Sequence, residues 1–169
     1  MSISTSANLV FDLDGTLVDT KKAVFEAYRY VGVNMPEDAW GKNWREWLTG
    51  PDAEKLHKAK NTIYLKTVGL YAQPLELLPF VEKAGYPVIT GASMIAAETI
   101  AIKFAPKLRI ALREATLDMK AKWLNDRRPG VYVDDDVRAR SFIEEKTKWK
   151  TWDPDQCLQS FLQPEPIHV

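Results

Sequence analysis

The sequence predicts an α/β fold, a three-layer Rossmann-like parallel sheet with a small all-helical insertion after the first strand. Short apolar runs that end in polar residues recur along the chain, and segments with helical periodicity separate them. Between residues 21 and 74 this alternation is interrupted by a charged stretch with helical patterning. Right-handed crossovers between parallel strands place helices on both faces of the sheet, which gives the three layers.

Five strands are expected, the first being the apolar run NLVFDL. The helices expected outside the insertion include a last one that Asp153 caps and Pro154 begins. The expected strands span residues 8–13, 86–90, 108–112, 131–133 and 149–152, and the other helices span 74–84, 93–104, 117–125 and 137–148. We assign residues 1–20 and 75–163 to the α/β core, 21–74 to the helical insertion and 164–169 to a loose tail.

Composition narrows the class of protein. The chain has 169 residues, 46% of them hydrophobic, which is enough for a buried core and excludes a disordered or fibrous protein. The 23 basic residues equal the 23 acidic residues, so no net charge attracts nucleic acid or anionic lipid. No apolar run approaches the ~20 residues that cross a bilayer. With one cysteine and no signal peptide, we expect a cytoplasmic protein without a membrane partner. Nothing indicates an oligomeric state.

The insertion is expected to hold three helices and no strand. They span residues 22–31, the stretch from Pro36 to Gly50, and residues 52–68. In the second helix, Trp40, Trp44 and Trp47 follow the spacing i, i+4, i+7 and share one face. This face is expected to form the core of the insertion. The alternative is that one indole ring stacks on a substrate. His57 is expected on the surface of the insertion.

Acidic side chains follow two of the predicted strands. Asp12 and Asp14 lie at the end of the first strand, Thr90 ends the second, and three acids beginning at Asp134 follow the fourth. The carboxyl ends of parallel strands meet at one edge of the sheet, where ligands bind. Carboxylates gathered there repel one another unless a cation or protons neutralise them. Because oxygen ligands suit a hard ion, the sequence predicts a Mg²⁺ site. Gly15 permits the bend that brings the first two acids together.

Four motifs in order resemble those of the haloacid dehalogenase (HAD) superfamily. The string LVFDLDGTLVDT resembles the first motif, VITGAS the second and VYVDDD the fourth. The third motif is a lysine that opens the helix before the last of these strands. In DMKAKWLND, Lys120 matches this position best, and Lys122 is the alternative. In that superfamily, a helical insertion such as residues 21–74 is a cap that closes over the site.

The resemblance implies a role for each residue at these positions. Asp12 would be the nucleophile that forms an aspartyl-phosphate, and Asp14 would transfer protons to and from the reacting oxygens. Mg²⁺ would be held by Asp12, the backbone carbonyl of Asp14 and Asp135, with Asp134 or Asp136 as the alternatives if the register shifts by one residue. Phosphate would bind Thr90, Gly91 and Lys120, and Thr16, Asp134 and Asp136 would support the site.

The resemblance therefore implies a magnesium-dependent phosphomonoesterase that acts on a phosphorylated small molecule. A 5'-nucleotidase or a small-metabolite phosphatase is favoured, with Trp44, Arg45 and Trp47 of the cap as candidate substrate contacts. One alternative is a phosphatase that processes nucleic-acid ends, with single strands stacked on the tryptophans. The other is a phosphate-accepting module without hydrolysis, because receiver domains also combine acids, a threonine and a lysine around magnesium.

Overall fold

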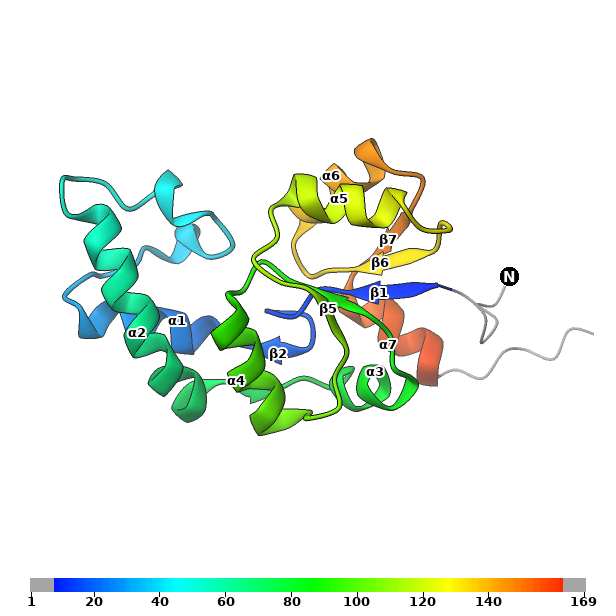
Figure 1. The fold of residues 1–169 in the computed structure, drawn as a ribbon, viewed down its shortest axis with the longest axis horizontal. Coiled ribbons are helices and arrows are strands. Elements are labelled where there is room, and N and C mark those ends of the chain that lie inside the picture. Colours follow the sequence, from blue (N-terminus) through cyan, green and yellow to red (C-terminus); the bar gives the residue numbers. More distant parts are fainter. Residues whose placement is uncertain (1–7, 163–169) are drawn as a thin grey trace, which may run out of the picture.

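The computed structural model describes residues 8–162, and a five-stranded parallel sheet lies at its centre (Figure 1). The strand order is β5-β4-β1-β6-β7, and every neighbouring pair is parallel. The strands are β1 (Leu9–Phe11), β4 (Val88–Ile89), β5 (Ile110–Leu112), β6 (Val131–Val133) and β7 (Lys150–Trp152). This arrangement confirms the predicted parallel sheet and places β1 at its centre.

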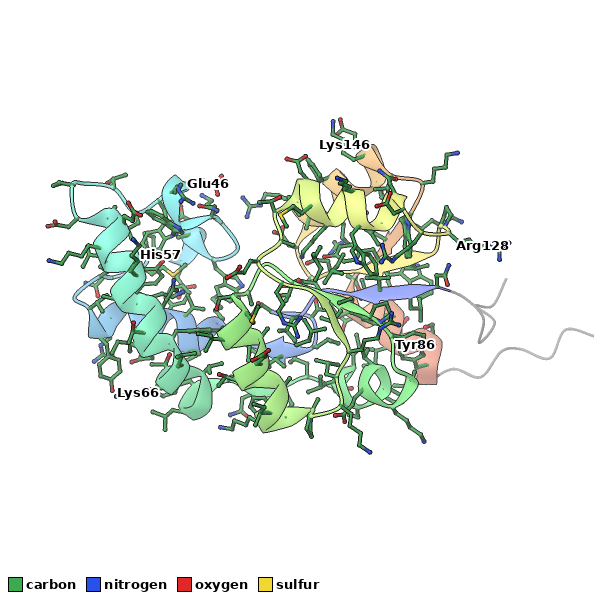
Figure 2. All side chains as sticks on the ribbon, in the orientation of Figure 1. Glu46, His57, Lys66, Tyr86, Arg128 and Lys146 are labelled. Atoms are coloured by element: carbon green, nitrogen blue, oxygen red, sulfur yellow. The ribbon has the colours of Figure 1, made fainter. Side chains whose placement is uncertain are left out.

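Helices cover both faces of the sheet. One face carries α3 (Leu78–Ala84), α4 (Met94–Phe104) and α7 (Pro154–Leu162), and the other carries α5 (Leu117–Asn125) and α6 (Val137–Lys146). Successive residues of a strand point to opposite faces, so Phe11 packs in the first layer and Val10 and Tyr132 pack in the second. Figure 2 shows the side chains that fill the space between the sheet and both helix layers. The structure confirms three layers.

Side-chain caps fix the starts of several helices. Ser93 accepts a hydrogen bond from the Ala96 amide at the start of α4, and Thr116 and Asp136 cap α5 and α6 in the same way. The predicted cap at Asp153 is confirmed, since its carboxylate accepts the Gln156 amide at 2.9 Å. Each bond satisfies an amide that has no partner within the helix. The caps therefore determine where the chain turns after each strand end.

The helical insertion consists chiefly of α1 (Lys21–Tyr30) and α2 (Ala53–Tyr71), which pack against each other (Figure 1). The Thr67 hydroxyl of α2 donates a buried hydrogen bond to the Ala23 carbonyl of α1 at 2.8 Å. The chain enters the insertion through β2 (Val18–Asp19) and leaves it through β3 (Gln73–Pro74), and these strands pair antiparallel. This two-stranded sheet was not predicted, and it delays the start of α3 to Leu78.

The predicted helix between Pro36 and Gly50 is wrong. The structure has two short 3-10 helices there, η1 (Glu37–Ala39) and η2 (Trp44–Glu46). Gly41 adopts a left-handed conformation, with φ of +84°, which interrupts any continuous helix. Asn43 then starts a new turn by capping the Arg45 amide, and Glu46 bonds back to the Asn43 amide.

Two further expectations concern the helix end and the tail. Helix α2 continues through Gly69 to Tyr71 instead of ending at the glycine, since a glycine inside a helix weakens it without breaking it. The tail 164–169 lies outside the described residues. Among the described helices, none is both long and apolar enough to cross a membrane.

Cys157 lies on the sheet-facing side of α7 and is fully buried. Burial raises the pKa of its thiol to about 12, so the group stays protonated and unreactive at neutral pH. This side chain serves as a small apolar residue in the layer formed by α3, α4 and α7.

Two glycines give a matched test of packing. A Cβ at Gly130 would overlap the backbone of Asn8, whereas a Cβ at Gly69 would meet no atom within 4 Å. We expect Gly130→Ala to lower the free energy of unfolding by about 1–3 kcal/mol through overpacking. Gly69→Ala should raise it by about 0.5–1 kcal/mol, because alanine favours the helix. Urea unfolding of both variants measures these changes, and equal shifts would contradict the packing at Gly130.

Candidate active site

Asp12 lies directly after β1, at the carboxyl end of the central strand. Its backbone amide donates to the Val133 carbonyl of β6 at 2.9 Å, which holds the chain beside the neighbouring strand end. The strand alternation turns its side chain toward α5, where Lys120 donates from Nζ to Asp12 Oδ1 at 2.9 Å. Both side chains are buried, so the fold itself places this ion pair.

A buried chain of hydrogen bonds continues from Lys120. Its ammonium also donates to the Tyr132 hydroxyl at 3.0 Å, and that hydroxyl donates to Asp134 Oδ2 at 2.7 Å. The other oxygen of Asp134 accepts the Asp136 amide at 2.9 Å. Burial alone favours the neutral amine, but Asp12 and Asp134 outweigh it and raise the pKa of Lys120. The lysine is therefore held as a cation.

Tyr132 was not predicted as a site residue, because it lies within the apolar run of a strand. The tyrosine is fully buried, and its hydroxyl group meets the Lys120 ammonium. Strand alternation was the available signal, since residues 132 and 134 must share one face of the sheet. A tyrosine two residues before an acid at a strand end can therefore bond to that acid.

The chain turns sharply after Asp12 and returns along the edge of the site. Gly15 has φ of +80°, and a Cβ at this position would collide with the Asp135 carboxylate. Thr16 donates from its hydroxyl to Asp135 Oδ1 and accepts the Asp135 amide, both at 3.1 Å. Glycine is thus required both for the turn and for the approach of the acid.

Asp14 lies on the same turn and faces the interior of the site. Its Oδ1 accepts a hydrogen bond from the Thr20 hydroxyl at 2.8 Å. Burial, with a contribution from the charge of Asp12, raises the pKa of Asp14 to about 6. This carboxyl can therefore hold and release a proton close to neutral pH.

Oxygen atoms of Asp12, Asp134 and Asp135 lie within 4.8 Å of one another, as the ligands of a metal ion would. Both oxygens of Asp134 already accept hydrogen bonds, whereas Asp135 keeps one oxygen without a partner among the described residues. An all-oxygen donor set fits a hard divalent cation such as Mg²⁺. The geometry thus fits the predicted cation and favours Asp135 over Asp134 as the direct ligand.

The remaining predicted site residues lie at different depths. Thr90 is fully buried beneath the cleft, and its hydroxyl oxygen accepts the Ala92 amide at 3.0 Å, whereas Gly91 lies on the cleft wall. Asp136 also borders the cleft but acts as the cap of α6. Lys122, the alternative to Lys120, is exposed on the outer side of α5. The structure therefore brings Lys120, and not Lys122, to Asp12.

The site opens into a cleft of about 1150 Å³ between the sheet edge and the helical insertion. Trp40, Trp44 and Trp47 all line it, although they do not share a helix face. Trp44 stacks on His57 with ring centroids 4.5 Å apart and lies 4.5 Å from the guanidinium of Arg45. Trp47 meets the Tyr28 ring edge-on at 4.8 Å. The three tryptophans are half-buried and belong to neither buried core cluster of the described residues, so they form part of the cleft wall and not the expected core of the insertion.

Helix α2 supplies two cleft residues that were not predicted to line the cleft, Lys60 and His57. Lys60 is 9% exposed, and its ammonium lies 5.1 Å from the Tyr28 ring and 4.8 Å from the Tyr64 ring. Burial lowers the pKa of Lys60 to about 8, against the opposing effect of Asp14. His57 is half-buried, not on the surface, because its Nδ1 bonds the Tyr28 hydroxyl at 3.0 Å. Burial, with Lys60 and Arg45, lowers the pKa of His57 to about 4, so it is neutral at pH 7.

The hydrogen-bond chain through Tyr132 can be tested by removing one oxygen. Tyr132→Phe should lower the free energy of unfolding by about 1–3 kcal/mol, because it leaves an oxygen of Asp134 buried without a donor. Tyr86→Phe is the matched control, since the hydroxyl of this half-buried tyrosine makes no hydrogen bond within residues 8–162. Urea unfolding compares the two variants. Equal losses would contradict a stabilising role for the Tyr132 hydroxyl.

Comparisons of the sequence with protein-family models and with curated proteins give no match. Solved structures do match. A HAD-like family hydrolase from Streptococcus pneumoniae is 16% identical with a TM-score of 0.68, covering 94% of this chain and 99% of its own. A protein described as a phosphoglycolate phosphatase, from Lactobacillus plantarum, is 10% identical with a TM-score of 0.72, covering 98% and 94%.

A third similar structure is CbbY from Rhodobacter sphaeroides in complex with phosphate, which is 16% identical with a TM-score of 0.67, covering 87% of this chain and 85% of its own. At such low identity the likeness concerns the architecture, and it agrees with the strand order and with the helical insertion after β1 and β2. The chain has the haloacid dehalogenase-like fold.

Proposed function

We propose that the protein is a magnesium-dependent phosphomonoesterase that works through an aspartyl-phosphate intermediate on Asp12. The observation that carries the proposal is the position of this carboxylate. It ends the central strand, it is bonded to the buried ammonium of Lys120 at 2.9 Å, and it faces a large cleft beside Asp134 and Asp135. The likeness to a structure described as a phosphoglycolate phosphatase supports the same reaction.

In the proposed reaction, a carboxylate oxygen of Asp12 attacks phosphorus and the bond from phosphorus to the ester oxygen breaks. Asp14 gives its proton to the departing oxygen, which leaves as an alcohol. A water molecule then attacks the aspartyl-phosphate, Asp14 takes its proton, and inorganic phosphate and the free carboxylate are restored. The pKa of Asp14, raised to about 6 by burial and by Asp12, suits both halves of this cycle.

The surrounding residues would bind and orient the phosphoryl group. Lys120 offers a fixed positive charge to the phosphoryl oxygens, and Gly91 offers its backbone amide on the cleft wall. The Thr90 hydroxyl holds the next amide, that of Ala92, and so fixes this segment from below. Mg²⁺ held by Asp12, Asp135 and the carbonyl of Asp14 would offset the charge between the nucleophile and the phosphoryl oxygens. Thr16 positions Asp135, while Asp134 and Asp136 support the strand end.

The proposed substrate is a phosphorylated small molecule, which agrees with the phosphate held by CbbY. The cleft wall offers aromatic rings and cations, which suit either a nucleoside monophosphate or a small anionic metabolite. His57 stacks on the face of Trp44 and the Arg45 guanidinium lies over the same ring, whereas Trp47 meets Tyr28 edge-on. Trp47 is therefore the better candidate for stacking on a base. We also propose a cytoplasmic location, with which a chain that forms no internal disulfide is compatible.

Asp12→Asn should reduce phosphatase activity to below a few per cent of the wild-type rate, because the amide lacks the nucleophilic charge. The amide oxygen can still accept a hydrogen bond from Lys120, so the variant should remain folded. Asp19→Asn, an exposed acid outside the cleft, is the control and should keep full activity. Steady-state hydrolysis rates and thermal melting check both variants. If Asp12 of the wild-type protein takes up a labelled phosphoryl group and never releases it, the protein is a phosphate-accepting module instead.

Activity should require Mg²⁺ and disappear in a chelator, and Ca²⁺ should support it poorly because calcium prefers a larger and looser shell. Asp135→Ala should raise the Mg²⁺ concentration for half-maximal activity by about tenfold or more, since it removes a charged ligand. Asp136→Ala should leave that concentration nearly unchanged. Metal titrations of the two variants measure the difference, and the reverse order would make Asp136 the ligand.

Trp47→Leu should raise KM for a nucleoside monophosphate by about tenfold while sparing glycerol phosphate, because a stacked base contributes about 1–3 kcal/mol. Trp44→Leu should affect both substrates alike by disturbing the stack on His57. Kinetics on both esters separate the two effects. If neither variant changes the substrate ranking, the nucleotide is the wrong substrate and the phosphatase proposal stands without it.

A further inference from the structure

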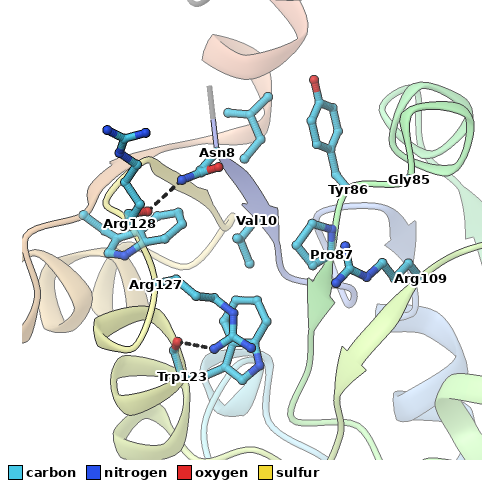
Figure 3. Close-up of a pocket in the computed structure, with 11 residues that line it drawn as sticks. Asn8, Val10, Gly85, Tyr86, Pro87, Arg109, Trp123, Arg127 and Arg128 are labelled. Carbon is cyan, nitrogen blue, oxygen red and sulfur yellow. Dashed lines mark hydrogen bonds between the residues drawn. The ribbon is translucent and has the colours of Figure 1, made fainter. Parts of the chain in front are cut away.

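A second hollow, of about 450 Å³, lies at the amino ends of the strands, whereas the cleft lies at their carboxyl ends. Figure 3 shows the residues that line this hollow. It is bordered by the residues that lead into β1, β4, β5 and β7 and by the loop that follows α5. Its size is in the range of pockets that hold small ligands. None of its lining residues takes part in the proposed phosphatase reaction, so its role is independent of that proposal.

The hollow is positively charged. Arg109, Arg127 and Arg128 line it, and no acidic residue is among its lining residues. Figure 3 shows Arg109 extending from one side of Val10 and the other two arginines coming from the opposite side. In the part of the chain from residue 8 to 162, no carboxylate pairs with any of these three guanidinium groups. An anion placed between them would relieve their mutual repulsion.

Arg127 is held in place before any ligand binds. Its guanidinium lies 3.4 Å from the centre of the Trp123 ring and donates to the Trp123 carbonyl at 2.7 Å. Asn8 donates from its side-chain amide to the Arg128 carbonyl at 2.8 Å, which ties the loop after α5 to β1. A planar guanidinium that is already fixed binds an oxyanion with less loss of side-chain entropy.

The floor of the hollow is apolar. Val10 and Trp149 are buried there, and Pro87 forms the adjoining wall. The Trp149 indole N–H is already used, since it donates to the Leu124 carbonyl at 2.8 Å. A free inorganic anion would contact only the rim, whereas an organic molecule would also cover this floor.

We infer that this hollow is a binding pocket for an organic phosphate, with its phosphoryl oxygens on Arg109 and Arg127 and its apolar body on the floor. Guanidinium forks match phosphoryl oxygens in geometry and charge. Inorganic phosphate shares the anionic group but lacks the body, so it should bind more weakly. The pocket is separated from the cleft by the length of the strands, so its ligand can act without competing with the substrate.

The chain carries its own reporters for a test. Of its six tryptophans, Trp123 and Trp149 line this pocket, while Trp40, Trp44 and Trp47 line the cleft. Indole N–H signals in ¹⁵N-resolved NMR spectra, assigned by single Trp→Phe variants, thus distinguish the two sites. AMP and inorganic phosphate are titrated separately in a chelator, so that no metal assists binding in the cleft.

We expect AMP to shift the Trp123 and Trp149 signals saturably and with higher affinity than inorganic phosphate. Arg109→Gln and the double variant Arg109→Gln/Arg127→Gln should weaken AMP binding by about tenfold or more, because each removes a charged donor. The Arg109 side chain is exposed and makes no hydrogen bond within residues 8–162, so its replacement leaves the fold intact. Arg29→Gln, on the exposed side of α1, is the matched control and should bind as the wild type.

If AMP does not move the Trp123 and Trp149 signals, or binds the arginine variants as tightly as the wild type, the hollow is not a binding pocket for an organic phosphate. Equal affinities for AMP and inorganic phosphate would overturn the role of the apolar floor. Retained phosphatase activity in Asp12→Asn would overturn the proposed reaction without changing these indole signals, so the two proposals fail separately.

Discussion

The ion pair between Lys120 and Asp12 is the interaction on which the whole acidic edge of the sheet depends. Three carboxylates from two adjacent strand ends lie within 4.8 Å of one another, and they would repel one another if each were charged and unpaired. The buried ammonium offsets this repulsion directly at Asp12 and, through Tyr132, at Asp134. Loss of one partner from such a buried pair typically costs about 3–5 kcal/mol. Helix α5 is therefore held to the sheet by charge as well as by packing.

Much of this arrangement could be predicted from sequence, because it follows from short-range patterns. Apolar runs between helical segments define a parallel sheet, and the carboxyl ends of parallel strands must meet at one edge. The choice of Lys120 rested instead on the motif resemblance, whereas the sheet and its acidic edge were predicted from patterns alone. These predictions depend on local periodicity and on the handedness of crossovers, which tertiary contacts seldom override.

The features that could not be predicted from sequence were missed for different physical reasons. The i, i+4, i+7 spacing of Trp40, Trp44 and Trp47 is helical only if the chain between them is helical, and Gly41 and Asn43 each redirect it. The pair β2–β3 has two residues in each strand, which is too short for any alternation to be visible. Lys60 was missed because the sequence of α2 does not show which of its faces borders the cleft.

Equal numbers of acids and bases conceal a separation of charge across the sheet. Acidic side chains gather at the carboxyl ends of the strands, and arginines that pair with no carboxylate of residues 8–162 gather at the amino ends. The sum of 23 positive and 23 negative residues therefore says little about what either edge attracts.

The single buried thiol has an experimental consequence. Cys157 lies between α7 and the sheet with no exposed surface, so a thiol reagent can reach its sulfur only when that helix detaches. The rate of labelling therefore counts openings of this face of the molecule, and no second cysteine contributes to the signal. Mass spectrometry of the labelled chain would therefore measure how often the layer that contains α7 opens in the native protein.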